Sequence, residues 1–218
     1  MTVVCLHGLR RTPADWDGVR AALERAGPVC APAVPADPGA ALATARSIVA
    51  PGDVVVGHSL GGVVALRLAA ERPLRALVLT GCFFPPARNG RGVARTLADY
   101  AGHRLAYARS VSPGPSPGAT RALPILARQG LLALRRGTTP PVPATTPVLV
   151  VHARDDHHVP VDFALAAVAA HPPWTAAILP RGGHHLHVTD PDAWLRAVLP
   201  WLRSPEPGDA GPPGGDRG

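Results

Sequence analysis

Ser59 stands in a pattern whose residue types and spacing favour nucleophilic chemistry. Gly57, Ser59 and Gly61 form a Gly-x-Ser-x-Gly sequence, which follows the valines at 54–56 and precedes helix-forming residues at 63–70. A strand that turns sharply into a helix exposes the serine oxygen, and flanking glycines relieve the crowding at such a turn. Backbone N–H groups at the helix start point at any negative charge formed there. The pattern therefore predicts a nucleophile rather than an incidental serine in a glycine-rich turn.

A serine nucleophile also needs donors that stabilise the oxyanion of a tetrahedral intermediate. His7, Gly8 and Leu9 directly follow the first predicted strand. We predict that the backbone N–H groups of Leu9 and Leu60 are the two donors. We interpret the side chain of His7 as a buried histidine that hydrogen-bonds its loop and does no chemistry.

Acid and base candidates follow two later strands. Asp155 and Asp156 come after the apolar run at 147–152, where one carboxylate could orient an imidazole and the other could be a loop cap or a solvated charge. The base candidates come after a glycine pair: they are His184, His185 and His187. Position alone does not choose among these histidines.

The elements that must position these residues alternate along the chain. Apolar runs predict strands at 2–6, 29–34, 54–56, 75–80, 147–152 and 175–179. Helical spacing predicts helices at 14–26, 40–50, 63–70, 161–170 and 192–202. This alternation predicts an α/β fold with a mostly parallel six-stranded sheet and helices on both faces. The carboxyl ends of parallel strands meet at one edge, so the candidate residues should converge there.

Two segments depart from this alternation. We interpret residues 83–146, approximately, as a small helical lid inserted in one α/β domain at 1–203, with two ordinary surface helices as the alternative. Residues 204–218 are rich in Pro, Gly and Asp with almost nothing apolar, which predicts a disordered C-terminal tail.

Composition restricts the possible partners. The net charge is +7, but the basic residues are all arginines, mostly scattered singly, and aromatic residues make up only 4%, which argues against a nucleic-acid stacking surface. No apolar run is long enough to span a bilayer, and we see no secretory signal. Cys5, Cys30 and Cys82 show no paired spacing, which predicts free thiols and a cytoplasmic location. The oligomeric state is not indicated.

Together these motifs resemble the α/β-hydrolase fold superfamily over residues 2–203. The motifs that carry the resemblance are His7-Gly8, Gly57-His58-Ser59-Leu60-Gly61-Gly62, Asp156-His157-His158-Val159-Pro160 and Gly183-His184 with Asp190-Pro191. In that family two residues separate the acid from a Val-Pro pair, which implies Asp156. The family base follows a glycine and lies seven residues before a proline, which implies His184. The order Ser59, Asp156, His184 is the order of the family's catalytic triad.

The resemblance is to small serine esterases and thioesterases of that superfamily. It implies hydrolysis of a small-molecule carboxylic ester or thioester through an acyl-enzyme, with no cofactor and no metal. The residues predicted to line the substrate pocket are His58, Phe83, Phe84, Leu97 and Leu105. Ala153 stands where many relatives have glycine, and the residues after the second predicted strand lack the usual glycine-rich pattern.

Several alternatives stay open. The same residues fit a non-hydrolytic acyltransferase or lyase, or a catalytically silent ligand-binding protein. The histidine and aspartate clusters could bind a metal, although no spacing matches a known zinc signature. Epoxide hydrolases and haloalkane dehalogenases resemble this fold but carry an aspartate at the elbow, and Ser59 argues against both.

Overall fold

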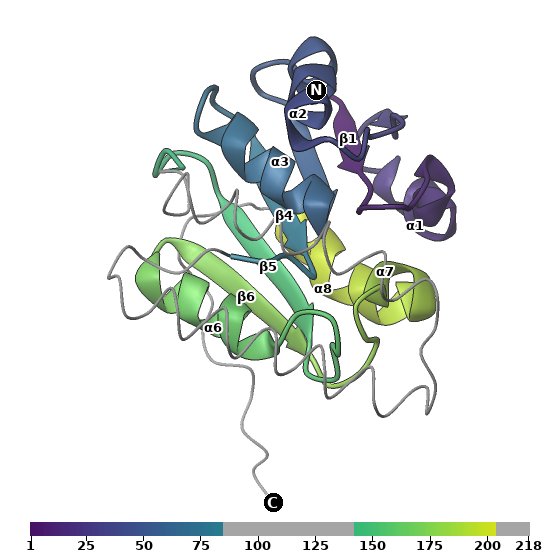
Figure 1. Ribbon diagram of the computed structural model, residues 1–218, viewed down its shortest axis with the longest axis vertical. Helices are drawn as coiled ribbons and strands as arrows, with labels where there is room; N and C mark the ends of the chain where they lie inside the picture. Colours follow the sequence, from purple (N-terminus) through teal and green to yellow (C-terminus); the bar gives the residue numbers. More distant parts are fainter. Residues whose placement is uncertain (85–141, 204–218) are drawn as a thin grey trace, which may run out of the picture.

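The chain folds around one parallel sheet. The structure, a computed structural model, describes residues 1–84 and 142–203 (Figure 1). Within them six strands lie in the order β2-β1-β3-β4-β5-β6, and every neighbouring pair is parallel. The strands are β1 (Val3–Leu6), β2 (Val29–Cys30), β3 (Val54–His58), β4 (Ala76–Thr80), β5 (Val148–Ala153) and β6 (Trp174–Leu179). The predicted six-stranded α/β sheet is confirmed, with all of its strands parallel.

Helices cover both faces of the sheet, as predicted. They are η1 (Pro13–Trp16), α1 (Asp17–Leu23), α2 (Pro38–Ile48), α3 (Leu60–Ala69), α6 (Val161–Ala170), α7 (Leu186–Thr189) and α8 (Pro191–Arg203). Residues of α2, α3 and α6 pack on one face, and residues of η1, α1, α7 and α8 pack on the other (Figure 1).

Alternate side chains of each strand enter the two cores. In β3, Val55 joins the core under α3, whereas Val54 and Val56 join the core under α1 and α8. All three valines are 2% exposed or less. Burial on both faces explains why the strands are continuous apolar runs instead of alternating ones. Each fully buried valine or leucine contributes about 1.5 to 3 kcal/mol.

The second predicted strand is shorter than expected. We predicted a strand over 29–34, but only Val29–Cys30 pairs with β1. Pro32 has no N–H for the sheet ladder, so the strand cannot continue past it as a regular partner. The Val34 N–H instead donates to Nε2 of His7, 2.8 Å away. The chain thus leaves the sheet and supports the loop that follows β1.

The histidine segment after β6 also differs from the prediction. We expected a glycine loop there, and the structure adds the short helix α7, which begins at Leu186. Leu186 is fully buried and joins the core with Trp194 of α8. The helix forms because Leu186, on one side of this otherwise polar segment, packs into the core.

Three other predictions concern the rest of the chain. Most of the predicted lid and the whole predicted tail lie outside the described residues. The described helices include none that is both long and apolar enough to cross a membrane. Cys5, Cys30 and Cys82 are free thiols, as predicted.

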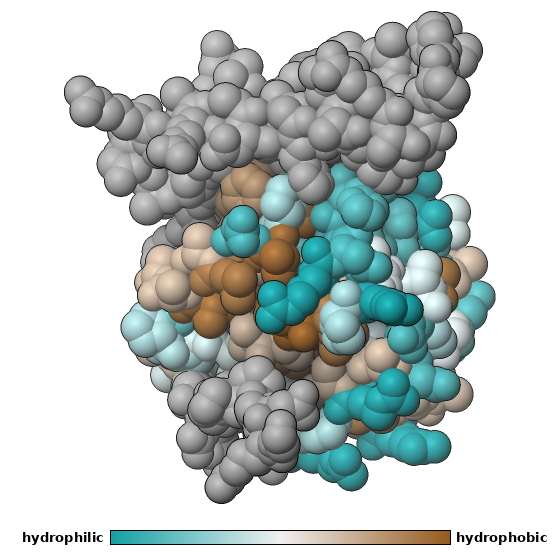
Figure 2. Space-filling view, turned by 90° about the horizontal axis from the view of Figure 1, so that it is seen from below, coloured by the Kyte–Doolittle hydropathy of each residue, from teal (hydrophilic) through white to brown (hydrophobic). Residues whose placement is uncertain are grey.

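Helix α6 has an unusually apolar composition. Eight of the ten residues in its sequence, VDFALAAVAA, are alanine, valine or leucine, and Leu165 on it is 42% exposed. Figure 2 shows apolar residues gathered on the face of the molecule that is seen from below, where α6 lies, with hydrophilic residues beside them.

The turn between β3 and α3 depends on close backbone contacts. A Cβ on Gly61 would lie 2.1 Å from the Leu6 carbonyl oxygen, and one on Gly57 would lie 2.6 Å from the Cα of Gly62. A Cβ on Gly62 would lie 1.8 Å from the Cys82 sulfur. The helix start can therefore lie against β1 and β4 only because side chains are missing at these positions.

We predict that Gly61→Ala destabilises the protein by about 3 kcal/mol or more, because its methyl group would overlap backbone that cannot move cheaply. The matched control is Gly18→Ala in α1, where a Cβ meets nothing within 4 Å. Removing that glycine from a helix should stabilise the fold by about 0.5 to 1 kcal/mol. Urea unfolding of both variants measures the difference, and equal effects would contradict the packing described here.

Candidate active site

Ser59 lies at the tip of a strained turn between β3 and α3. Its φ is 51° and its ψ is −113°, a conformation that residues with a side chain rarely adopt. Its N–H donates to the Thr80 carbonyl at 3.0 Å, and its carbonyl accepts from the N–H groups of Gly62 and Val63 at 3.1 and 3.2 Å. The strain is thus held by bonds to β4 and to the first turn of α3.

Asp156 and His184 form a hydrogen-bonded pair. Nδ1 of His184 donates to Oδ2 of Asp156 at 2.9 Å, although the two residues lie 28 positions apart. Oδ1 of Asp156 accepts from the N–H groups of His158 and Val159 at 2.7 and 2.8 Å. Since Nδ1 carries the hydrogen, Nε2 of His184 is left as a proton acceptor.

The Asp156 carboxylate stays ionised despite its burial. Burial by itself would raise its pKa, but hydrogen bonds from His152, His184 and the Val159 N–H outweigh this and hold the pKa well below its usual range. A buried carboxylate that remains charged can orient an imidazole and stabilise its protonated form.

Asp155, the neighbouring aspartate, has a different task. Its Oδ1 accepts the Gly183 N–H at 2.8 Å. It therefore caps the loop that carries His184, as expected for the second aspartate. Asp156 thus holds the ring of His184, and Asp155 holds the backbone of the loop that carries His184.

The elbow and the acid–base pair meet at the carboxyl edge of the sheet. A Cβ on Gly81, directly after β4, would lie 2.9 Å from the His184 carbonyl oxygen, and the preceding Thr80 carbonyl holds the Ser59 N–H. The ring of His58, next to Ser59, donates from Nε2 to the His184 carbonyl at 2.9 Å. Among the described residues no hydrogen bond joins the Ser59 hydroxyl to the His184 ring. Nucleophile–base hydrogen bonds often tighten only when substrate is bound.

The loop after β1 forms a turn beside Ser59. The Arg11 N–H donates to the Gly8 carbonyl at 3.2 Å, and Arg10, in the third position of this turn, has a φ of 60°. A Cβ on Gly8 would lie 3.2 Å from the Ser59 Cβ. Within the described residues the N–H groups of Leu9 and Leu60 donate no hydrogen bond.

His7 is a structural residue, as predicted. Nε2 accepts the Val34 N–H at 2.8 Å and Nδ1 donates to the Gly8 carbonyl at 2.9 Å. Both ring nitrogens are therefore used to hold the turn.

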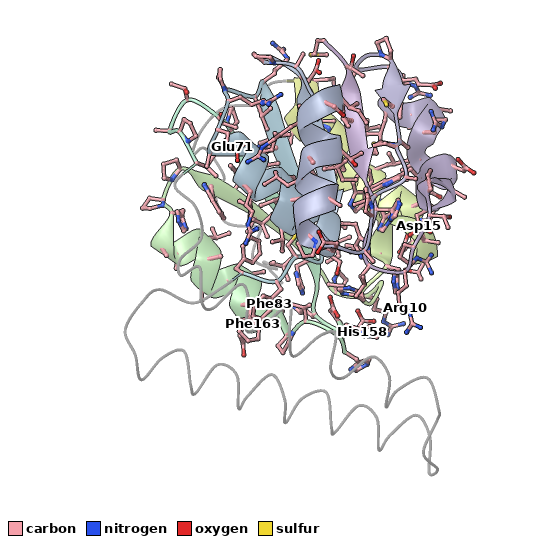
Figure 3. The ribbon with its side chains drawn as sticks, turned by 45° about the horizontal axis from the view of Figure 1, so that its top comes forward. Arg10, Asp15, Glu71, Phe83, His158 and Phe163 are labelled. Carbon is pink, nitrogen blue, oxygen red and sulfur yellow. The ribbon has the colours of Figure 1, made fainter. Side chains whose placement is uncertain are left out.

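The predicted pocket residues lie in different surroundings. The ring of His58 is only 1% exposed and lies beneath the edge, and Phe84 is 2% exposed in the core against Trp174. Phe83 is half-buried and packs against Phe163 of α6 with ring centroids 5.3 Å apart. Figure 3 places Phe83, Phe163, His158 and Arg10 along the same edge, away from Glu71. Leu97 and Leu105 lie outside the described residues.

The other histidines after β6 are placed differently from His184. His187 is fully buried, with its ring 4.4 Å from that of Trp16, and burial lowers its pKa to about 3. Burial also lowers the pKa of His185 to about 4. Among the described residues, neither of these two rings forms a hydrogen bond or an ion pair with Asp156. The structure thus pairs the acid with the histidine that the resemblance implies.

One buried cluster has the donor atoms of a metal site. Asp15, His58 and His187 each offer an atom within 4.8 Å of the others. Nδ1 of His58 and both ring nitrogens of His187 have no hydrogen-bond partner in the described structure. The cluster differs from the two histidine loops considered from the sequence, because only His187 belongs to those loops.

The charges of this cluster argue against a divalent cation. Arg11 donates to both oxygens of Asp15, at 2.6 and 2.7 Å, and so already neutralises this carboxylate. Burial lowers the pKa of His58 and of His187, so both rings are neutral. A divalent ion here would leave two uncompensated positive charges in a buried site. A water molecule could bridge Nδ1 of His58 and one ring nitrogen of His187 without adding charge.

Sequence reasoning missed two residues of this site. His152 in β5 contacts Asp156, and Asp15 in η1 pairs with Arg11, the last residue of the turn after β1. A histidine within a run of buried valines was a signal for the first, because such a polar group needs a partner. The spacing of residues along the sequence gave no signal for Asp15.

The fold and the position of this site define a class of protein. A parallel α/β sheet with a strand–serine–helix turn near its centre places ligands at the carboxyl edge. The family model described as "Alpha/beta hydrolase family" matches residues 3–198, and the chain therefore belongs to this family.

Solved structures share the fold at low sequence identity. NosK from Streptomyces actuosus has a TM-score of 0.64 at 23% identity, covering 94% of this chain and 98% of NosK. An esterase (EaEST) from Exiguobacterium antarcticum has a TM-score of 0.62 at 16% identity, covering 94% and 92%. The thioesterase domain from the curacin biosynthetic pathway has a TM-score of 0.62 at 18% identity, covering 91% and 90%.

We predict that His187→Phe weakens the acid sensitivity of the fold. The unfolded chain protonates this histidine near pH 6.5, while the folded chain keeps it neutral to about pH 3. The unfolded state therefore binds more protons as pH falls through this window, and stability declines. Between pH 7 and 5 the variant should lose about 1 to 2 kcal/mol less than the wild type. Urea unfolding at both pH values measures this, and parallel losses would contradict it.

Proposed function

We propose that this protein is a serine hydrolase that cleaves a carboxylic ester or thioester through an acyl-enzyme. The observation that carries the proposal is the Asp156–His184 hydrogen bond at the sheet edge where the strained Ser59 turn also lies. A nucleophile, a base and an ionised acid are the three parts that acyl transfer requires.

In the proposed reaction Ser59 attacks the carbonyl carbon of the substrate. Nε2 of His184 takes the hydroxyl proton and later returns it to the leaving alcohol or thiol. Asp156 stabilises the imidazolium formed in between. A water molecule, activated by the same imidazole, then opens the acyl-enzyme and releases the acid. None of these steps requires a cofactor.

The N–H groups of Leu9 and Leu60 would hold the oxyanion. Support comes from their lack of partners among the described residues and from the position of Gly8 against Ser59. Each such donor is worth about 3 kcal/mol of transition-state stabilisation. The donors are backbone groups on two separate elements, so their spacing is set by the packing of β1 against β3.

The substrate is proposed to be a small acyl ester or thioester with an apolar part. Phe83 and Phe163 provide apolar surface at the edge. Family membership supports hydrolytic chemistry, and two of the solved structures that share this fold are an esterase and a thioesterase domain. An acyltransferase or lyase would use the same residues, and nitrophenyl esters graded by acyl length, with one thioester, would separate these possibilities. A cytoplasmic location remains part of the proposal.

We predict that Ser59→Ala reduces ester hydrolysis by at least about 1,000-fold, because the attacking oxygen is removed. The variant should also lose labelling by a fluorophosphonate probe while keeping its circular dichroism spectrum. Ser47→Ala is the matched control: its hydroxyl bonds the Thr44 carbonyl on exposed α2, and its loss should leave activity unchanged. Substantial hydrolysis by the Ser59 variant, or a wild-type protein that the probe does not label, would overturn the proposed function.

We further predict that a chelator such as EDTA leaves hydrolysis unchanged, because every proposed step uses side chains and backbone groups of the chain. The control is the same assay after dialysis against added zinc. Loss of activity that zinc restores would show that a metal takes part.

A further inference from the structure

His152 is a buried histidine that the proposed reaction does not use. It lies in β5, one residue before the strand ends, and is 0% exposed. Its neighbours along the strand are valines and an alanine, which are all buried in the cores. A polar ring at such a position must be held by specific partners.

The contacts of this ring fix the position of its hydrogen. Nε2 lies 2.9 Å from the Val159 carbonyl oxygen, and a carbonyl oxygen only accepts. The hydrogen is therefore on Nε2. The same nitrogen lies 3.3 Å from Oδ2 of Asp156, so the Nε2–H is shared between the carbonyl and the carboxylate. Nδ1 has no partner among the described residues, which agrees with a ring that carries its hydrogen on Nε2.

The Asp156 oxygen that His152 contacts is the one that faces the base. Oδ2 accepts from His184, and Oδ1 accepts the two backbone N–H groups of His158 and Val159. His152 thus adds a side-chain donor on the oxygen that would otherwise have His184 as its only partner among the described residues. It also bonds Val159, which supplies one of the backbone donors.

We propose that His152 is a positioning residue for the catalytic acid. Resting on the proposed Ser59–His184–Asp156 function, the inference is that the shared Nε2–H directs Oδ2 toward His184 and limits the negative charge that this oxygen presents to it. His152 does not touch the reacting atoms and acts only through Asp156.

The two effects have different signatures. Loss of the anchor allows the carboxylate to turn away from the ring, which lowers the rate. Loss of the donor leaves more of the negative charge on Oδ2 for His184 to neutralise, which favours the protonated imidazole. A residue that only filled space would not produce the second effect.

Other titratable groups around the pair are unchanged by substitution of His152. The rings of His58, His158 and His185 lie 4.9, 4.9 and 5.1 Å from the His184 ring, and the buried Cys82 thiol donates to the Gly57 and Thr80 carbonyls. A change in the titration of His184 would therefore report the loss of His152.

The test compares His152→Met, which fills space without a donor, with His152→Gln, whose amide N–H can replace Nε2–H. For His152→Met we expect kcat/KM for a nitrophenyl ester to fall roughly 10-fold or more. The acid limb of its pH profile should move upward by about 0.5 pH unit. His152→Gln should keep most of the wild-type kcat/KM, and the acid limb of its pH profile should coincide with that of the wild type.

A second readout does not depend on turnover. NMR of the ¹⁵N-histidine-labelled protein should show the midpoint of the His184 titration at higher pH in His152→Met. His171→Met is the matched control, because its ring also bonds a main-chain carbonyl, that of Ala167, far from Asp156. It should change neither readout.

The outcomes separate the two proposals. A wild-type rate and an unshifted His184 titration in folded His152→Met would overturn the positioning role, and so would equal losses in the Met and Gln variants. A wild type that Ser59→Ala does not inactivate would overturn the proposed function instead. If His152→Met does not fold, His152→Leu, which also fills space without a donor, takes its place in the comparison with His152→Gln.

Discussion

The absence of side chains between the start of α3 and the end of β1 is the constraint on which the rest of the site depends. Gly61 lies so close to the Leu6 carbonyl that the helix begins directly against the neighbouring strand. The chain must therefore reverse direction within one residue, and Ser59 takes the unfavourable conformation. The same contact sets the distance between the Leu60 N–H and the turn that carries Leu9. Ser59 and the N–H groups of Leu9 and Leu60 are thus placed by the same close packing, which depends on the glycines.

A second feature of the site is that some of its buried titratable groups are charged and others are neutral. Asp156 keeps its charge because donors surround it, whereas the rings of His58 and His187 are kept neutral because burial disfavours their charge. Negative charge is consequently concentrated on Asp156, next to His184. The neutral rings fill the volume behind the base without competing for a proton near pH 7. This division explains how several histidine rings can lie at one edge of the sheet while, of the three described histidines that follow β6, only His184 is bonded to Asp156.

Much of this arrangement follows from the sequence, because its strongest signals are local. The valine run before Ser59, the glycines around it and the alternation of apolar and helical segments determine a parallel sheet and its carboxyl edge. The choice of Asp156 and His184 needed the family resemblance, since Asp155 and His185 stand at neighbouring positions with the same chemistry. The burial of His58 and Phe84 was not visible, because residue type does not tell which side of a strand end faces the core. The short second strand and α7 depended on tertiary contacts of Val34 and Leu186, which no local pattern reveals.

The packing of Cys82 against Gly62 gives the molecule an internal reporter. The sulfur occupies the space that a side chain at position 62 would need, and burial raises the pKa of this thiol far above its ordinary value. A thiol in that state does not react with alkylating reagents while α3 stays against β4. Its modification therefore requires the helix start to separate from the sheet, which is also the movement that would dismantle the serine turn. The rate at which a small alkylating agent consumes this cysteine measures how often the start of α3 separates from the sheet.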